Sequence, residues 1–293
     1  MEAQRMLGFL FAFIKGINEF WTEIHTYRQF SKEVEKMKAP EEIVKVWRKF
    51  DGFPMETLTK AWYYEKAGAK KQRSIELMKA HREKYGITGN CFDLALWLLE
   101  EFKEAGIRAY PIGSHLGTME AHAALAAEDK EGNRYLCDLG DQWLEPILIE
   151  ASSSKFQSGK LAGFFPGAEV EVLPGKCEVE ILYHRPNGKI SRQKYGLEPV
   201  SEEAFWEAAE FSQNHIYPKV LFEMRLPYKG ETAHWEFEDW QSCLSTSQGL
   251  IEDPPLATLD EWVERLHQKS GFDRNFLKES LEIYKEMNSG KSG

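Results

Sequence analysis

The stretch GITGNCFDLALWLLEEFKEAG (Gly86–Gly106) places a cysteine at the start of a long apolar segment. Asn90 is a favoured N-cap residue and Gly106 a favoured C′ residue, so the sequence predicts a helix that begins near Cys91 and ends at Gly106. The free N–H groups and positive dipole end of such a helix start stabilise a thiolate, which is the nucleophilic form of cysteine. Cys91 is therefore a candidate nucleophile. The other interpretation is a small apolar residue that fills space.

The segment EAHAALAAEDKEGNRYLCDLGDQW (120–143) predicts a β-hairpin whose turn is centred on Lys130. This register would place His122 directly across from Asp138, with both side chains on the same face of the sheet. A carboxylate beside an imidazole fixes its tautomer and orientation, and an oriented base next to a nucleophile is the pattern of covalent catalysis. We therefore predict Cys91, His122 and Asp138 as catalytic residues. A purely structural His–Asp pair is the alternative.

The character of the sequence changes twice along the chain. Residues 1–105 favour helices and form the predicted helical domain that carries the nucleophile. Residues 106–200 contain short β-forming runs separated by Gly, Pro, Asn and Asp, which indicates an antiparallel β-barrel that carries the histidine and the aspartate. Residues 201–293 mix both patterns and form the predicted α/β lid. The Ser/Gly-rich segment Ala151–Gly167 is expected to be a loop that shapes access to the site.

Composition excludes several classes of protein. The net charge is −10 and no Lys/Arg block occurs, so a nucleic-acid partner is not expected. The four cysteines form no CxxC pair, so neither a metal site nor a disulfide scaffold is expected, and strand alternation sends Cys137 into the core. The apolar run Met6–Ile14 is too short to span a bilayer, so we expect a buried helix there, no membrane partner and a cytoplasmic protein.

The order of the three predicted catalytic residues resembles that of the arylamine N-acetyltransferases. In that family a Cys in an RGGxCxE-like motif precedes a His at a strand and an Asp in a DVGFG-like motif; here the corresponding elements are GNCFD, His122 and DLG. FPMETL (53–58) is similar to the PFENL segment of the family, and LEPILIE (144–150) to its Pro-Leu stretch. FSQNHIYPKVLFEMRL and TLDEWVERLHQKSGF resemble its last third, so the likeness covers nearly the whole chain.

This resemblance implies a cysteine-proteinase-like α+β core and acyl transfer through an acyl-cysteine. Acetyl-coenzyme A would be the donor and a small-molecule amine the acceptor, without a tightly bound cofactor. Backbone N–H groups at Cys91 and near Gly140 would bind the oxyanion. The residues expected to contact substrate are neighbours of the catalytic residues, namely Asn90, Phe92, Gly140, Asp141 and Gln142.

The sequence departs from the family pattern at two places. Ile87 and Thr88 replace the Arg-Gly that precedes Gly89, which would leave Glu56 without its expected arginine partner. DLGDQW replaces DVGFG, and the acidic and amide groups there would favour a polar or cationic acceptor. GNCFD is also similar to transglutaminase-like cysteine hydrolases, so an amidase or protease that uses the same three residues is an alternative function. A binding protein without activity is a third possibility.

Overall fold

The computed structural model describes residues 36–289, so the predicted helix over Met6–Ile14 lies outside the described residues. The helices are α2 (Glu41–Trp47), the short 3-10 helix η1 (Arg48–Phe50), α3 (Leu58–Tyr64), α4 (Ile75–Tyr85), α5 (Cys91–Glu104), α6 (Glu202–Gln213), α7 (Leu259–Ser270) and α8 (Arg274–Ser289). Within the described residues, none of these helices has the length and apolar content needed to cross a membrane.

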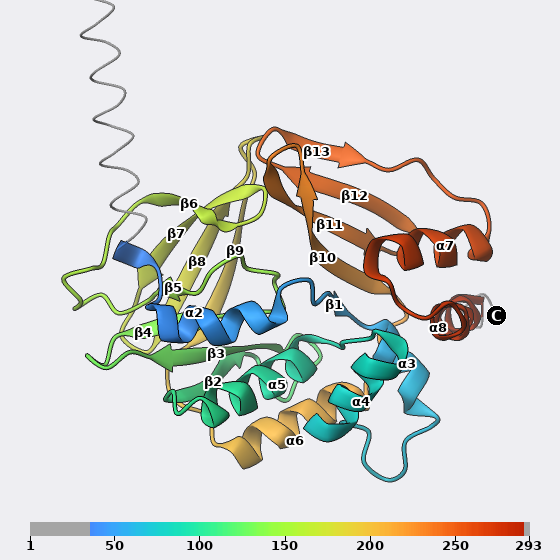
Figure 1. The fold of residues 1–293 in the computed structure, drawn as a ribbon, viewed down its shortest axis with the longest axis horizontal. Coiled ribbons are helices and arrows are strands. Elements are labelled where there is room, and N and C mark those ends of the chain that lie inside the picture. Colours follow the sequence, from blue (N-terminus) through green and yellow to red (C-terminus); the bar gives the residue numbers. More distant parts are fainter. Residues whose placement is uncertain (1–35, 290–293) are drawn as a thin grey trace, which may run out of the picture.

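Two antiparallel sheets lie side by side, with the helices around them (Figure 1). The larger sheet has the order β5-β4-β3-β2-β9-β8-β7-β6. Its strands are β2 (Ala109–Ser114), β3 (His122–Glu128), β4 (Arg134–Cys137), β5 (Ile147–Leu148), β6 (Lys160–Phe165), β7 (Ala168–Pro174), β8 (Glu178–His184) and β9 (Ile190–Gly196). This sheet curls into a nearly closed barrel, and the Leu144 N–H, just before β5, donates to the Phe164 carbonyl of β6 across the opening (2.8 Å).

The smaller sheet has the order β1-β10-β11-β12-β13, so a short segment from early in the chain forms one of its edges. Its strands are β1 (Met55–Glu56), β10 (Leu221–Tyr228), β11 (Glu231–Glu238), β12 (Gln241–Thr246) and β13 (Gly249–Glu252). The Glu56 N–H also donates to the Gly89 carbonyl (2.9 Å), which ties β1 to the turn that precedes α5.

Two hydrophobic cores correspond to the two sheets. The first core joins α2, α5 and α6 to the barrel. Strand β3 is buried on both faces, because α5 packs closely against its alanine-rich run. The second core joins α3, α7 and α8 to the smaller sheet. The N-terminal third of the chain therefore contributes to both cores, and the division at residues 105 and 200 into three domains stays a prediction.

Most of the predicted elements are confirmed. The helix that starts at Cys91 is present, as are the predicted strands on either side of the 129–133 turn. The prediction that all of Ala151–Gly167 is a loop is wrong, because its second half forms β6. The sequence after Lys160 is LAGFF, and its pairing with β7 supplies the backbone hydrogen bonds that a loop would lack.

Candidate active site

Cys91 is the first residue of α5, and the cap that precedes it fixes its position. The Asn90 side chain accepts hydrogen bonds from the N–H groups of Phe92 (3.0 Å) and Asp93 (3.1 Å). The Asp93 carboxylate in turn accepts from the Asn90 N–H (3.2 Å), which completes a capping box. The predicted cap is confirmed, and it leaves the partly exposed Cys91 at the positive end of the helix.

The fully buried side chain of Arg73 stabilises this cap. Arg73 forms an ion pair with Asp93 (3.1 Å) and donates to the Thr88 carbonyl. Gly89 adopts a φ of +143°, and an added Cβ there would lie 2.1 Å from an Asp93 carboxylate oxygen. Only glycine therefore fits between the arginine and the cap. Arg73 comes from the segment before α4, and no motif in the sequence marks it as a partner of the nucleophile turn.

Glu56 is also buried, and its carboxylate has a hydrogen-bond partner other than the arginine that the family pattern would supply. Its carboxylate accepts from the Thr59 N–H (2.7 Å) and from the Thr59 hydroxyl. Burial raises the pKa of Glu56, while these hydrogen bonds and the nearby charge of Arg73 act in the opposite direction. An arginine from a different position in the chain thus stands near Glu56 in place of the one missing before Gly89.

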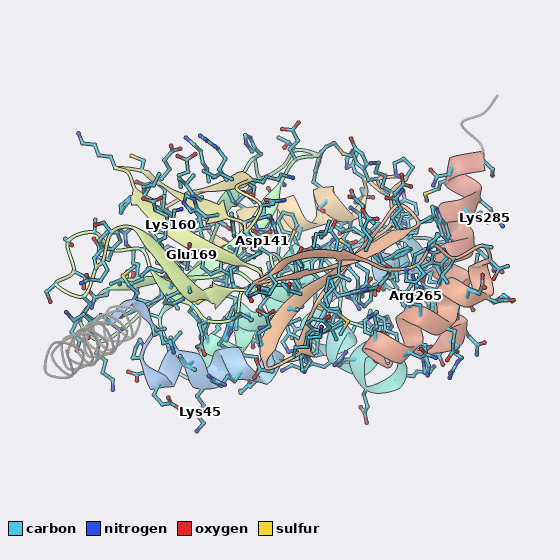
Figure 2. The ribbon with its side chains drawn as sticks, turned by 90° about the horizontal axis from the view of Figure 1, so that it is seen from above. Lys45, Asp141, Lys160, Glu169, Arg265 and Lys285 are labelled. Atoms are coloured by element: carbon cyan, nitrogen blue, oxygen red, sulfur yellow. The ribbon has the colours of Figure 1, made fainter. Side chains whose placement is uncertain are left out.

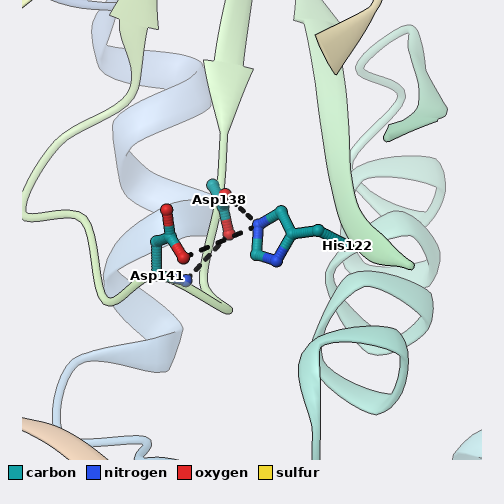
Figure 3. A group of neighbouring side chains, drawn as sticks. All are labelled: His122, Asp138 and Asp141. Carbon is teal, nitrogen blue, oxygen red and sulfur yellow. Dashed lines mark hydrogen bonds and ion pairs between the residues drawn. The ribbon is translucent and has the colours of Figure 1, made fainter. Parts of the chain in front are cut away.

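His122 begins β3 and points at two carboxylates, as Figure 3 shows. Its Nε2 lies 2.6 Å from Oδ2 of Asp138, which is fully buried. The same oxygen accepts from the Tyr195 hydroxyl (2.7 Å), and Oδ1 accepts from the Asp141 N–H (3.0 Å). Asp138 is therefore held in place by three donors, and it fixes the orientation of the imidazole.

The predicted direct pairing of His122 and Asp138 is wrong by two residues. The observed register pairs Leu125 with Cys137, and β4 ends before Asp138. The Asp129 side chain accepts from N–H groups at 131 and 133, and this turn moves the centre of the hairpin by one residue. A shift of the centre by one changes the pairing by two, which keeps both side chains on the same face. The contact therefore survives as a diagonal one.

Cys91, His122 and Asp138 come together around Gly140. A Cβ added at Gly140 would lie 2.7 Å from the Cβ of Cys91, 3.1 Å from Cε1 of His122 and 3.1 Å from Oδ1 of Asp138. Because Asp138 occupies Nε2 of the ring, Nδ1 is the nitrogen left for the cysteine. The structure thus brings together the three side chains that the sequence predicted. Cys137 is buried in the core as expected, and burial raises the pKa of its thiol.

The charges around His122 favour its protonated form. Burial alone would lower the pKa of His122. The negative charges of Asp138 and Asp141 and the side-chain interactions with Asp138 and Cys91 outweigh burial and raise the pKa well above its usual range. The imidazolium form of the ring is therefore favoured next to the Cys91 sulfur.

A cavity of about 340 Å³ opens over these side chains. Of the predicted substrate-contacting residues, Asn90, Gly140 and Asp141 line it together with Cys91 and His122. Asp141 lies 3.8 Å from His122 and accepts from the Tyr183 hydroxyl (2.8 Å). Figure 2 shows Asp141 near the middle of the molecule, where the two sheets meet.

Two predicted substrate-contacting residues lie outside the lining of this cavity. Phe92 is fully buried and packs against Phe205 of α6. Gln142 is fully buried, and its amide donates to the Leu139 carbonyl (2.8 Å). The segment Ala151–Gly167 does not contribute to this lining either, and its role in access to the site stays a prediction.

Comparison with known proteins finds similarity at the level of structure. No protein-family model and no curated protein sequence matches the chain. The arylamine N-acetyltransferase of M. smegmatis aligns with a TM-score of 0.65 at 12% identity, covering 85% of this chain and 92% of that one. The Salmonella typhimurium enzyme gives 0.59 at 15% identity, covering 86% and 92%. The Mycobacterium marinum enzyme in complex with CoA gives 0.60 at 12% identity, covering 80% and 88%.

The chain has the arylamine N-acetyltransferase fold. The predicted α+β class with a cysteine-proteinase-like core is thereby confirmed, and the resemblance stated from the sequence is confirmed as a resemblance of fold. On this arylamine N-acetyltransferase fold the cavity has a second side that sequence motifs did not indicate. It is formed by residues from β1, from α3 and its N-cap, from the end of α6 and the segment after it, and from β10, namely Met55, Thr57, Lys60, Phe211, Ser212, His215, Tyr217, Leu221 and Glu223.

One group of side chains has the composition of a metal site. Single ligand atoms of His122, Asp138 and Asp141 all lie within 4.8 Å of one another. Both oxygens of Asp138 already accept hydrogen bonds, from His122, Tyr195 and the Asp141 N–H. The group is therefore complete as a hydrogen-bonded network around an imidazolium. The expectation that the protein binds no metal stays a prediction.

Proposed function

We propose that this protein is an acyltransferase that moves an acetyl group from acetyl-coenzyme A to an amine through an acyl-Cys91 intermediate. The observation that carries the proposal is the position of Cys91, which stands at a helix N-terminus, beside an imidazole oriented by buried Asp138, and faces a cavity. The fold shared with arylamine N-acetyltransferases, one of them in complex with CoA, supports this choice of reaction and donor.

In the first half-reaction the Cys91 sulfur attacks the thioester carbonyl carbon. A new S–C bond forms, and the bond to the coenzyme A sulfur breaks as the His122 imidazolium gives its proton to that leaving thiolate. In the second half-reaction the amine attacks the acyl carbon, and the neutral His122 takes a proton from the amine. The bond to the Cys91 sulfur then breaks, which regenerates the thiolate and the imidazolium.

Two backbone donors are candidates for the oxyanion of each tetrahedral intermediate. In the first turn of α5, the Asn90 side chain and carbonyl accept the N–H groups of the three residues after Cys91, and this leaves the Cys91 N–H for a ligand. The second candidate is the N–H of Gly140, whose backbone lies against the Cys91 side chain. Donors fixed in advance in this way stabilise charge that develops in the transition state.

The acyl-enzyme is the species that tests this proposal. The protein is incubated with acetyl-coenzyme A alone, digested and analysed by mass spectrometry. We expect one acetyl group on the peptide that contains Cys91, no adduct in Cys91→Ala, and the normal adduct in Cys137→Ala. An unmodified Cys91 peptide, or the same labelling in both variants, would overturn the proposal. Hydrolysis of a peptide or glutamine amide without any acetyl adduct would instead favour the amidase alternative.

A further inference from the structure

Lys60 of α3 is a cation that lines the cavity and has no partner among the described residues. It is partly buried and lines the same cavity as Cys91. Within residues 36–289 its ammonium group has no hydrogen bond or ion pair, although most of the other buried cations do. Arg73, for comparison, is paired with Asp93 and the Thr88 carbonyl.

An ammonium group that is partly removed from water without a partner is unfavourable, so its presence here requires an explanation. Burial lowers the pKa of Lys60 to about 8, although the nearby Cys91 and Asp93 act to raise it. Asp93 cannot serve as its partner, because its two oxygens already bind Arg73, Gln72 and Gln213. The position that remains for an anion is the cavity itself, next to the reacting sulfur.

We infer that Lys60 binds a carboxylate on the substrate, carried either by the acceptor amine or by the acyl group, and so makes this enzyme selective for anionic substrates. This inference rests on the proposed function, since it concerns the ligand of the same site. The phosphate groups of coenzyme A are excluded as the anion, because the pantetheine arm separates them from the thioester that must reach Cys91.

The carboxyl group that β10 contributes to the cavity does not repel a bound carboxylate. Glu223 of β10 lines the cavity, and burial together with the charges of Asp141 and Glu236 raises its pKa well above the usual range. Its protonated form is therefore favoured, and it can donate a hydrogen bond to a bound carboxylate. The sequence suggested a polar or cationic acceptor because of Asp141 and Gln142, but Gln142 is buried elsewhere and Asp141 interacts with His122 and Tyr183.

Alkylation of Cys91 tests the inference without any acyl transfer. Iodoacetate and iodoacetamide both transfer a CH₂ carbon to the sulfur with loss of iodide, and they differ in that one carries a carboxylate and the other a neutral amide. The ratio of their rate constants, measured on the Cys91 peptide, therefore reports the recognition of charge next to the sulfur. Any general change in the reactivity of the thiol cancels in this ratio.

We expect the iodoacetate/iodoacetamide ratio to fall roughly tenfold in Lys60→Met, which is the scale of one lost charge-assisted hydrogen bond. Lys60→Arg keeps the charge and should keep most of the ratio. Lys45→Met is the matched control, because it removes the same charge from an exposed position on α2, far from Asp141 (Figure 2). An unchanged ratio in Lys60→Met, with a normal unfolding curve, would overturn the inference.

Two substrate pairs then identify the source of the carboxylate. With acetyl-coenzyme A as donor, 4-aminobenzoate is compared with aniline as acceptor. Without acceptor, acylation of Cys91 by succinyl-coenzyme A is compared with acylation by butyryl-coenzyme A. A loss of the 4-aminobenzoate preference in Lys60→Met assigns the carboxylate to the acceptor, and a loss of the succinyl preference assigns it to the acyl group. If neither preference changes, Lys60 does not select the substrate and the inference is wrong.

Discussion

The two sides of the cavity differ in how far their polar groups are already paired. On the catalytic side, formed by Cys91, His122 and Asp138, each polar group is held by the first core, and Asp138 has three donors. On the ligand side, formed by Lys60 and Glu223, the elements belong to the second core. Among the described residues Lys60 has no hydrogen bond or ion pair, and the Glu223 carboxyl has only a long contact with His234 (3.9 Å). The difference indicates that the catalytic residues are already in position before a ligand binds. The polar groups of the ligand side, in contrast, depend on a bound ligand for their hydrogen bonds.

The largest expected effect comes from breaking the catalytic side at Asp138. Asp138→Asn removes the charge that orients His122 and raises its pKa, and an amide there favours the wrong tautomer of the ring. We expect kcat/KM for acetyl transfer to fall about 10²- to 10⁴-fold, and the limb of the pH–rate profile that reports the imidazolium to move to lower pH.

A matched variant on the same hairpin separates this effect from loss of structure. Asp129 is also buried and accepts hydrogen bonds from Asn133 and Tyr135, but it does not line the cavity. Asp129→Asn should lower the free energy of unfolding and leave kcat/KM and its pH profile close to those of the wild type. Equal losses of activity in both variants would mean that Asp138 is only a structural residue.

The support beneath the nucleophile is expected to contribute mainly to stability. Arg73→Met leaves the Asp93 carboxylate buried without its cation, so we expect the free energy of unfolding in urea to fall by about 3–5 kcal/mol. The double variant Arg73→Met/Asp93→Asn also removes the uncompensated charge, so it should recover part of that loss. If the loss came only from the space left by the arginine side chain, the second substitution would not recover it. A single-variant loss below about 1 kcal/mol would show that the ion pair contributes little.

Glu223 on the ligand side should have a smaller, pH-dependent effect on stability. Its pKa is raised in the folded protein, so the stability it contributes is present below the ordinary carboxyl pKa and is lost as the pH rises through the folded pKa. Glu223→Gln should therefore match the wild type near pH 4.5 and be more stable by roughly 1–2 kcal/mol at pH 8.

Thermal or urea unfolding at both pH values measures this difference. Glu83→Gln, at an exposed position on α4, is the control and should stay within about 0.5 kcal/mol of the wild type. If Glu223→Gln is less stable than the wild type at pH 8, the Glu223 carboxylate is stabilised in the folded protein. The contrast drawn between the two sides of the cavity would then be wrong.

The catalytic side could be predicted from the sequence, because local signals determine it. The Asn90 cap depends on residues within one helical turn, and the meeting of His122 with Asp138 depends only on the parity of a hairpin. An error of one residue in the centre of the turn changed the partner of His122 from directly opposite to diagonal, and the predicted contact survived. The boundaries of β6 were missed because its pairing with β7 is not visible in the composition of the segment.

The ligand side could not be predicted in this way. Lys60 and Glu223 are 163 residues apart in the numbering and reach the cavity only through the packing of α3 and β10 in the second core. Arg73 likewise reaches Asp93 by tertiary packing, with no spacing rule that connects the two. Neither Lys60 nor Arg73 belongs to a motif, and a lysine or arginine in a polar stretch is usually at the surface.

The site requires a residue without a side chain at Gly140, because a single methyl group there would obstruct it. Its bare backbone forms the floor between the sulfur and the imidazole, where a Cβ would lie 2.7 Å from the Cys91 Cβ. An alanine at this position would fill the space between Cys91 and His122 with its methyl group, although all three catalytic residues would still be present in the sequence. A search for active relatives that requires only the Cys, the His and the Asp would therefore include inactive proteins. Such a search should also require a glycine two residues after the aspartate.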